Sequence, residues 1–135
     1  MGAVRIGHGV RIAGNKEVIQ LVKDKGVFLE MCPTSNRQTK AMEEMSAYPL
    51  KAFLEMGLKV TLNTDDPAIE RTTLSREFRY MESLLDLTQE QKRLLLLNSV
   101  EAAFTSRNRK WKLKEQLFSE PYENYGEPII YKRIK

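Results

Sequence analysis

The chain has 135 residues, of which 41% are hydrophobic and 30% charged, a composition typical of a globular domain with its own core. No apolar stretch approaches the roughly 20 residues of a membrane span, and no N-terminal segment is typical of a signal peptide, so we expect no membrane partner. The single cysteine, Cys32, excludes an internal disulfide framework and favours a reduced, cytoplasmic setting.

The net charge of +4 is modest, and much of the excess lies in the last third of the chain. A basic segment of this kind can contact nucleic acid, but no groove-reading motif accompanies it. We therefore interpret it as a solvated helix face followed by a basic, loosely structured tail over residues 120–135. We expect no nucleic-acid partner.

Short apolar runs alternate with helical patterns in the first part of the chain. Strands are predicted over residues 4–7, 27–32 and 58–63. Asn15 can cap a helix that ends at Gly26, and Pro49 suits the first turn of a helix that Gly57 closes. The polar segment after Pro33, residues 34–39, is expected to be a loop.

Helical patterns dominate the second part of the chain. Apolar residues recur at helical spacing over residues 74–85, and Thr88 with Gln91 forms a capping box ahead of a leucine-rich helix. A last helix is predicted from about residue 106 to 118. Strands separated by helices of this length indicate parallel βαβ units and an α/β fold.

Chemically reactive residues follow each predicted strand, over residues 7–9, 32–36 and 63–67. In parallel α/β folds the functional residues gather at these strand ends. Taken singly, a histidine beside glycine is commonly structural, and two aspartates before proline are commonly turn formers. The agreement in position favours a functional site that contains His8, Asp65 and Asp66.

The two adjacent aspartates suit two different tasks. Neighbours on an extended segment point to opposite sides, so one carboxylate can reach a metal while the other faces a substrate. His8 beside such a metal can orient or deprotonate a bound water. Along the third strand and the residues after it, Thr61, Asn63 and Asp65 are expected to share the polar face that lines the interior below the site, and Val60 and Leu62 to face helices.

Glu30 is a charged residue in an otherwise apolar predicted strand. We predict that it pairs with Arg5 across neighbouring strands, with Gly7 and Gly9 turning His8 toward the site. The alternative is that both charged side chains simply face solvent.

Segments 5–9 (RIGHG), 29–36 (LEMCPTSN) and 60–67 (VTLNTDDP) resemble consecutive signature segments of the adenosine deaminase family, in the family's order. Segments 74–78 and 98–104 also fit, and the resemblance covers roughly residues 3–118. It implies that residues 1–119 are the C-terminal portion of a (β/α)8 barrel, comprising its last three strands and the following helices.

The resemblance also implies an activity, the hydrolysis of adenosine to inosine and ammonia at one catalytic zinc. His8 resembles the histidine that orients and helps to deprotonate the zinc-bound water. Asp65 resembles the carboxylate ligand of the zinc, and Asp66 resembles the residue that hydrogen-bonds a ring nitrogen of the purine nucleoside. A related purine such as adenine is an alternative substrate.

The departures from the family pattern concern the metal. The family's His-x-His and His-Ala-Gly-Glu segments are absent, and His8 is the single histidine. A catalytic zinc normally takes three protein ligands, and Cys32 is an improvised third donor that the family does not use. We therefore expect the chain alone to be inactive, and expect it to pair with an N-terminal half, to self-associate or to be a truncated product. A non-catalytic remnant or association module is the alternative.

Overall fold

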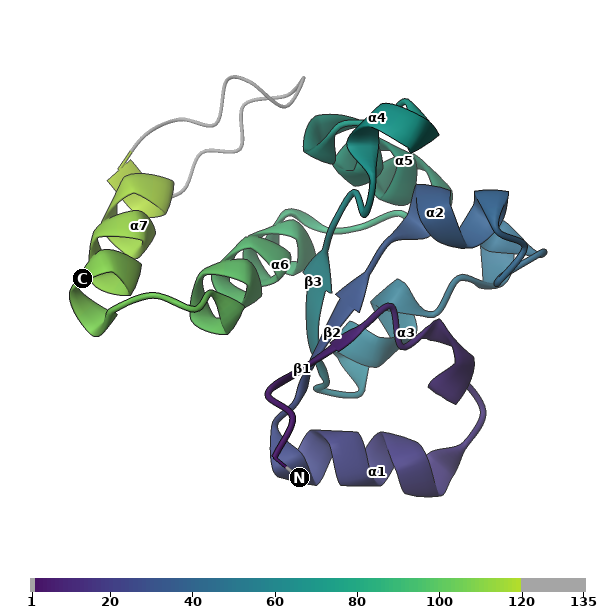
Figure 1. Ribbon diagram of the computed structural model, residues 1–135, viewed down its shortest axis with the longest axis horizontal. Coiled ribbons are helices and arrows are strands. Elements are labelled where there is room, and N and C mark those ends of the chain that lie inside the picture. The colour runs from purple at the N-terminus through teal and green to yellow at the C-terminus, as the bar shows by residue number, and fades with distance from the viewer. Residues whose placement is uncertain (1, 120–135) are drawn as a thin grey trace.

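Three parallel strands form the centre of the computed structural model, which describes residues 2–119 (Figure 1). The strands are β1 (Arg5–Gly7), β2 (Phe28–Met31) and β3 (Lys59–Leu62), and they lie side by side in the order β1-β2-β3. In the ladder Ile6 is opposite Leu29, and Leu29 is opposite Val60. The predicted parallel α/β arrangement is confirmed, and the carboxyl ends of the strands meet at one edge of the sheet.

The helices lie around this sheet and include two short 3-10 turns. Their bounds are η1 (Val10–Ile12), α1 (Lys16–Lys25), α2 (Pro33–Gln38), η2 (Met45–Ala47), α3 (Leu50–Glu55), α4 (Pro67–Glu70), α5 (Leu74–Leu85), α6 (Gln89–Ala102) and α7 (Arg107–Ser119). The local signals for α1 and α6 are confirmed. The Asn15 carboxamide oxygen accepts a hydrogen bond from the Val18 N–H at 3.1 Å, and Thr88 and Gln91 form the capping box.

The expected loop over residues 34–39 is wrong, because Pro33 begins the helix α2. Proline has no N–H to lose at a first helical position, and its backbone angle already suits a helix. A side chain distant in sequence pairs with a backbone N–H of the first turn of this helix, since the Glu77 carboxylate accepts a hydrogen bond from the Thr34 N–H at 3.1 Å. That contact joins α2 to α5.

The hydrophobic core lies between the sheet and the helices α3, α5 and α6, and α3 and α6 flank β3 in Figure 1. Val60 and Leu62 belong to this core, whereas Thr61 turns inward and its hydroxyl accepts a hydrogen bond from the Asn63 amide at 2.8 Å. The predicted alternation is thus confirmed for residues 60–63, and it ends before Asp65, where φ is positive.

The outer edges of the sheet differ. Asn98 of α6 donates its amide to the Val60 carbonyl at 2.8 Å, so α6 occupies part of the outer edge of β3. On β1, in contrast, Ile6 is 40% exposed.

None of the helices within residues 2–119 is long and apolar enough to cross a membrane. The predicted tail, residues 120–135, lies outside the described residues, so the domain boundary at residue 119 stays a prediction.

Candidate functional site at the strand ends

His8 directly follows β1 and turns sharply away from the strand. Its backbone N–H donates to the Glu30 carbonyl at 2.8 Å, and its φ of 59° lies in the left-handed region that non-glycine residues rarely adopt. Gly9 continues the turn with φ 72°, whereas Gly7 has no positive φ. The turn that we ascribed to two glycines is therefore made by His8 itself and Gly9. Strain of this kind persists where the surroundings hold it, commonly at functional sites.

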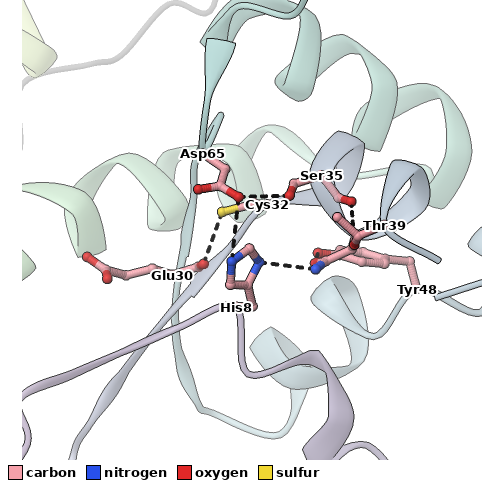
Figure 2. Close-up of polar contacts among 8 residues, drawn as sticks. His8, Glu30, Cys32, Ser35, Thr39, Tyr48 and Asp65 are labelled. Atoms are coloured by element: carbon pink, nitrogen blue, oxygen red, sulfur yellow. Dashed lines mark hydrogen bonds and ion pairs between the residues drawn. The ribbon is translucent and has the colours of Figure 1, made fainter. Parts of the chain in front are cut away.

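Asp65 follows β3 and faces His8 across the edge of the sheet (Figure 2). Its carboxylate oxygen Oδ2 lies 3.6 Å from His8 Nε2 and accepts a hydrogen bond from the Ser35 hydroxyl at 2.8 Å. Asp65 also has a left-handed backbone, with φ 65°. The structure thus brings two of the three predicted site residues together from opposite outer strands of the sheet.

Asp66 lies apart from this pair. Its carboxylate oxygen Oδ1 accepts hydrogen bonds from the N–H groups of Ala68 and Ile69, at 3.1 and 3.0 Å, and so caps α4. The two aspartates do not form the extended segment that we expected, because the backbone reverses at Asp65. The interpretation of the two aspartates as turn formers is therefore correct for their backbone. The predicted contact of Asp66 with a purine stays a prediction.

The second ring nitrogen of His8 is also paired. His8 Nδ1 lies 3.1 Å from the amide nitrogen Nδ2 of Asn36 in α2, and the Asn36 oxygen Oδ1 accepts a hydrogen bond from the Tyr48 hydroxyl at 2.7 Å. Asn36 and Tyr48 are both buried. Burial raises the pKa of Tyr48, because the phenolate would lose its hydration, so the hydroxyl stays protonated and can donate.

Cys32 is buried at the end of β2, and its thiol donates to the Glu30 carbonyl at 3.3 Å. Burial, followed by the negative charge of Asp65, raises the pKa of Cys32 from its ordinary value of 9.0 to about 12. The thiolate that metals bind is therefore disfavoured at this position.

The predicted pair of Arg5 and Glu30 is confirmed, with Arg5 Nη1 3.1 Å from Glu30 Oε1. The Glu30 side chain points away from His8 in Figure 2, while its backbone carbonyl faces the site. Arg5 also stacks on the Phe104 ring, with 3.7 Å between its guanidinium carbon and the ring centroid. Glu30 is thus balanced by a cation and does not take part in the site through its carboxylate.

A buried carboxylate anchors α2, which carries Ser35 and Asn36. Glu77 is fully buried in α5, and besides the Thr34 N–H it accepts the Thr72 hydroxyl at 2.5 Å. Our interpretation of the sequence placed Ser35 and Asn36 in a reactive segment at a strand end without individual roles, and it gave no role to Glu77 or Tyr48. Proline at a helix start signals α2, but nothing near Tyr48 or Glu77 in the sequence indicates their contacts.

Two cavities open beside the His8–Asp65 pair. One, of about 380 Å³, is lined by His8 and Asp65 with Val10, Ile12, Ser35 and Asn36. The other, of about 350 Å³, is lined by the same pair with Glu30, Cys32, Asn63 and Thr64. Each has the size of a small-molecule site, and the pair lies between them.

The donor atoms of residues 2–119 do not by themselves make a zinc site. No three histidine, cysteine, aspartate or glutamate side chains gather there in a way that could hold a metal ion. Asp65 is a carboxylate of the kind that zinc binds, but Cys32 is held as a thiol and His8 Nε2 faces Asp65. A zinc ion at this site would therefore need ligands from other residues.

Comparison with known proteins identifies the family. The family model described as adenosine deaminase matches residues 1–120. The chain belongs to the adenosine deaminase family. The chain is 45% identical over 114 residues to an adenosine deaminase of Clostridium botulinum (strain Okra / Type B1), a match that covers 84% of the chain and 34% of that relative. It is 39% identical over 122 residues to an adenosine deaminase of Enterococcus faecalis (strain ATCC 700802 / V583), covering 90% of the chain and 36% of that relative.

Solved structures of the family agree with the fold. The crystal structure of an adenine deaminase from Arthrobacter aurescens matches with a TM-score of 0.81 at 30% identity, covering 86% of this chain and 36% of that one. The fold is therefore the C-terminal portion of the family's (β/α)8 barrel, as predicted. The chain spans about a third of the length of the curated relatives that it matches.

Proposed function

We propose that the chain is part of a purine deaminase that hydrolyses adenosine to inosine and ammonia, and that it contributes His8, Asp65 and Asp66 to a site completed by residues from outside the chain. The observation that carries this proposal is the His8–Asp65 pair, set at 3.6 Å between two cavities at the strand ends. The curated relatives named adenosine deaminase support the substrate class.

Each residue has a stated task in this proposal. Asp65 is a zinc ligand, and the Ser35 hydroxyl orients its carboxylate. His8 orients the reacting water on the side of Asp65. Asp66 uses Oδ1 to cap α4, which leaves Oδ2 of this exposed side chain to accept a hydrogen bond from a purine. Bound zinc would supply a water molecule with a pKa lowered to about 7.

The need for a partner follows from the donor count. A catalytic zinc normally takes three protein ligands, and residues 2–119 offer no such group. We propose that the missing ligands belong to an N-terminal half of the barrel, which would also cover β1. Self-association of the chain is the alternative, although two copies would still supply one histidine each.

Adenine is the second candidate substrate. The similarity to the Arthrobacter aurescens adenine deaminase favours it, at 30% identity. The residues that separate a nucleoside from a free base must contact the ribose site, and neither Asp65 nor His8 does so in the proposed arrangement. A comparison of turnover on adenosine and adenine decides between the two substrates.

The test co-expresses this chain with the part of the Clostridium botulinum adenosine deaminase that the chain does not match. Bound zinc and adenosine turnover are measured on the complex and on the chain alone. We expect both to require the complex, and His8→Ala and Asp65→Asn to lower turnover by at least about a hundredfold.

Asp86→Asn is the matched control, because Asp86 is an exposed aspartate at the end of α5 that also has a positive φ. It should leave turnover unchanged. A stable complex that binds zinc but deaminates no purine would support the non-catalytic alternative. Turnover by the chain alone, lost on adding a chelator, would contradict the need for a partner.

A further inference from the structure

The two ring nitrogens of His8 face different partners. Nδ1 lies 3.1 Å from Asn36 Nδ2, and Nε2 lies 3.6 Å from Asp65 Oδ2. A neutral imidazole carries its proton on one nitrogen only, and the partner of the other nitrogen decides which one. An amide NH2 group can only donate, so its presence at Nδ1 makes Nδ1 the acceptor and leaves the proton on Nε2.

The orientation of the Asn36 amide is therefore the deciding feature. Its oxygen accepts from the Tyr48 hydroxyl at 2.7 Å, and its nitrogen then faces His8. If the amide were reversed, its nitrogen would face Tyr48, and the hydroxyl would lose its acceptor. Asn36 Oδ1 is the acceptor recorded for Tyr48 within residues 2–119. A buried donor without an acceptor costs about 1–3 kcal/mol, so the observed orientation is preferred.

The Tyr48 hydroxyl is a dependable donor. The Tyr48 side chain is buried in the hydrophobic core, which also contains Leu50 and Phe53. This burial raises the pKa of Tyr48. Asn36 is held just as firmly, because its backbone N–H donates to the Cys32 carbonyl at 2.9 Å and its carbonyl accepts from the Met42 N–H at 3.1 Å. The buried pair thus presents one fixed donor to an imidazole that is itself partly exposed.

We propose that Tyr48 and Asn36 are positioning residues that hold His8 in the Nε2–H tautomer, with its proton directed at Asp65 and the space beside it. Neutral His8 then donates a hydrogen bond on the side of Asp65 and has no free lone pair there. Its task at the site is to hold an oxygen in place by donating this hydrogen bond. The tautomer follows from the geometry of this chain, while its role in deamination rests on the proposed function.

The full chain offers a direct measurement, because His8 is its single histidine. Nitrogen-15 labelling of histidine gives one imidazole signal set, and long-range proton–nitrogen correlation spectra identify the protonated nitrogen. The spectra are recorded over a series of pH values, and the tautomer is identified where the imidazole signals no longer change as the pH rises. We expect Nε2 to carry the proton and Nδ1 to give the downfield resonance of an acceptor nitrogen.

Two variants separate the roles of the pair. Asn36→Asp replaces the amide donor by a carboxylate acceptor of the same shape, and we expect the proton to move to Nδ1. Tyr48→Phe removes only the hydroxyl, so the Asn36 amide is free to reverse, and we expect the intermediate shifts of two tautomers in fast exchange. Tyr80→Phe removes a phenol hydroxyl from the ring beneath Arg37 and should leave the His8 spectrum unchanged.

A wild-type spectrum with the proton on Nδ1 would overturn the proposal, as would an Asn36→Asp spectrum in which the proton stays on Nε2. A melting transition recorded for each variant shows that it is folded, and the wild-type spectrum alone decides the tautomer if a variant does not fold.

Activity provides a separate readout. In the complex with the partner part, Tyr48→Phe should lower kcat by about tenfold or more with KM unchanged, as expected for a residue that orients a catalytic group. The spectra need neither zinc nor substrate. The tautomer can therefore be established when deaminase activity is absent, and deaminase activity can be present when the tautomer assignment is wrong.

Discussion

The strands β1 and β3 each end in a residue of the proposed site, yet the rest of the molecule holds them very differently. Val60 of β3 is completely buried under α6 and α3, whereas Val4, next to β1, is 55% exposed. Asp65 thus extends from a packed strand. His8 extends from an outer strand of three residues. Its position depends on the hydrogen bond that its N–H donates to the Glu30 carbonyl and on the contact of its ring with the Asn36 amide.

The site therefore has a well-packed inner half and a less buried outer half. The inner half consists of β2, β3, α2 and α5. Ser35 of α2 donates to Asp65 after β3, and Thr34 of α2 donates to Glu77 of α5. The outer half is β1 with His8, and a covering element from outside the chain would stabilise it most.

The largest expected effect comes from breaking the anchor of the inner half. Glu77→Ala leaves the Thr34 N–H and the Thr72 hydroxyl without their buried acceptor, and we expect the free energy of unfolding to fall by about 3 kcal/mol. Glu77→Gln keeps one acceptor oxygen and should cost about 1 kcal/mol. Urea unfolding measures both variants. A Glu77→Ala loss no larger than that of Glu43→Ala, an exposed control, would contradict the anchor.

A pair of identical substitutions tests the comparison of the strands directly. Val60→Ala removes two buried methyl groups and leaves a cavity, so we expect a loss of about 2 kcal/mol. Val4→Ala removes the same atoms from an exposed position and should change stability by less than about 0.5 kcal/mol. The midpoint of urea unfolding reports the difference. Equal losses at the two positions would mean that β1 is covered in solution.

The turn at His8 is tested by a pair of glycines. Gly9 and Gly14 both have positive φ, 72° and 85°, so alanine is strained at each. At Gly9 the new methyl group would also lie 2.7 Å from the buried Leu29 Cδ2, whereas nothing lies within 4 Å at Gly14. We expect Gly9→Ala to cost about 1 kcal/mol more than Gly14→Ala in thermal unfolding. Equal costs would show that Leu29 yields easily.

The smallest expected effect concerns the ion pair beneath the outer half. The side chains of Arg5 and Glu30 are 29% and 31% exposed, so water and salt screen the attraction between their charges. A double-mutant cycle with Arg5→Ala and Glu30→Ala should give a coupling energy of about 0.5 kcal/mol that decreases at high salt. The cycle removes the separate contribution of Arg5 stacked on Phe104. A coupling of several kcal/mol would mean that the pair is shielded from solvent.

The parts of the fold that the sequence predicts are those governed by neighbouring residues. Strand positions, the Asn15 cap and the Thr88 capping box depend on residues within a few positions of one another, and all are confirmed. The loop prediction over residues 34–39 is wrong because a polar segment can also be helical, and Pro33 at the first position carries a helix signal. The error at Asp65 arose because an extended backbone was assumed where φ is positive.

The candidate site was predictable to the extent that parallel strands align their ends. Each βαβ unit makes its two strands parallel, and this arrangement is enough to place His8 and Asp65 at the same edge of the sheet. Asp66 follows the same strand, but its side chain is used by the neighbouring helix, a choice that depends on the backbone turn.

By itself, then, the sequence determined the α/β class, the parallel sheet, the family resemblance and the edge at which His8 and Asp65 lie, because each depends on local pattern or on motifs. Only the tertiary structure decided which atoms meet. The Glu77–Thr34, Ser35–Asp65 and Asn36–His8 contacts join residues 43, 30 and 28 positions apart. Hydrogen bonds over such separations form only when the chain packs, and they set the direction in which each ring or carboxylate of the site points.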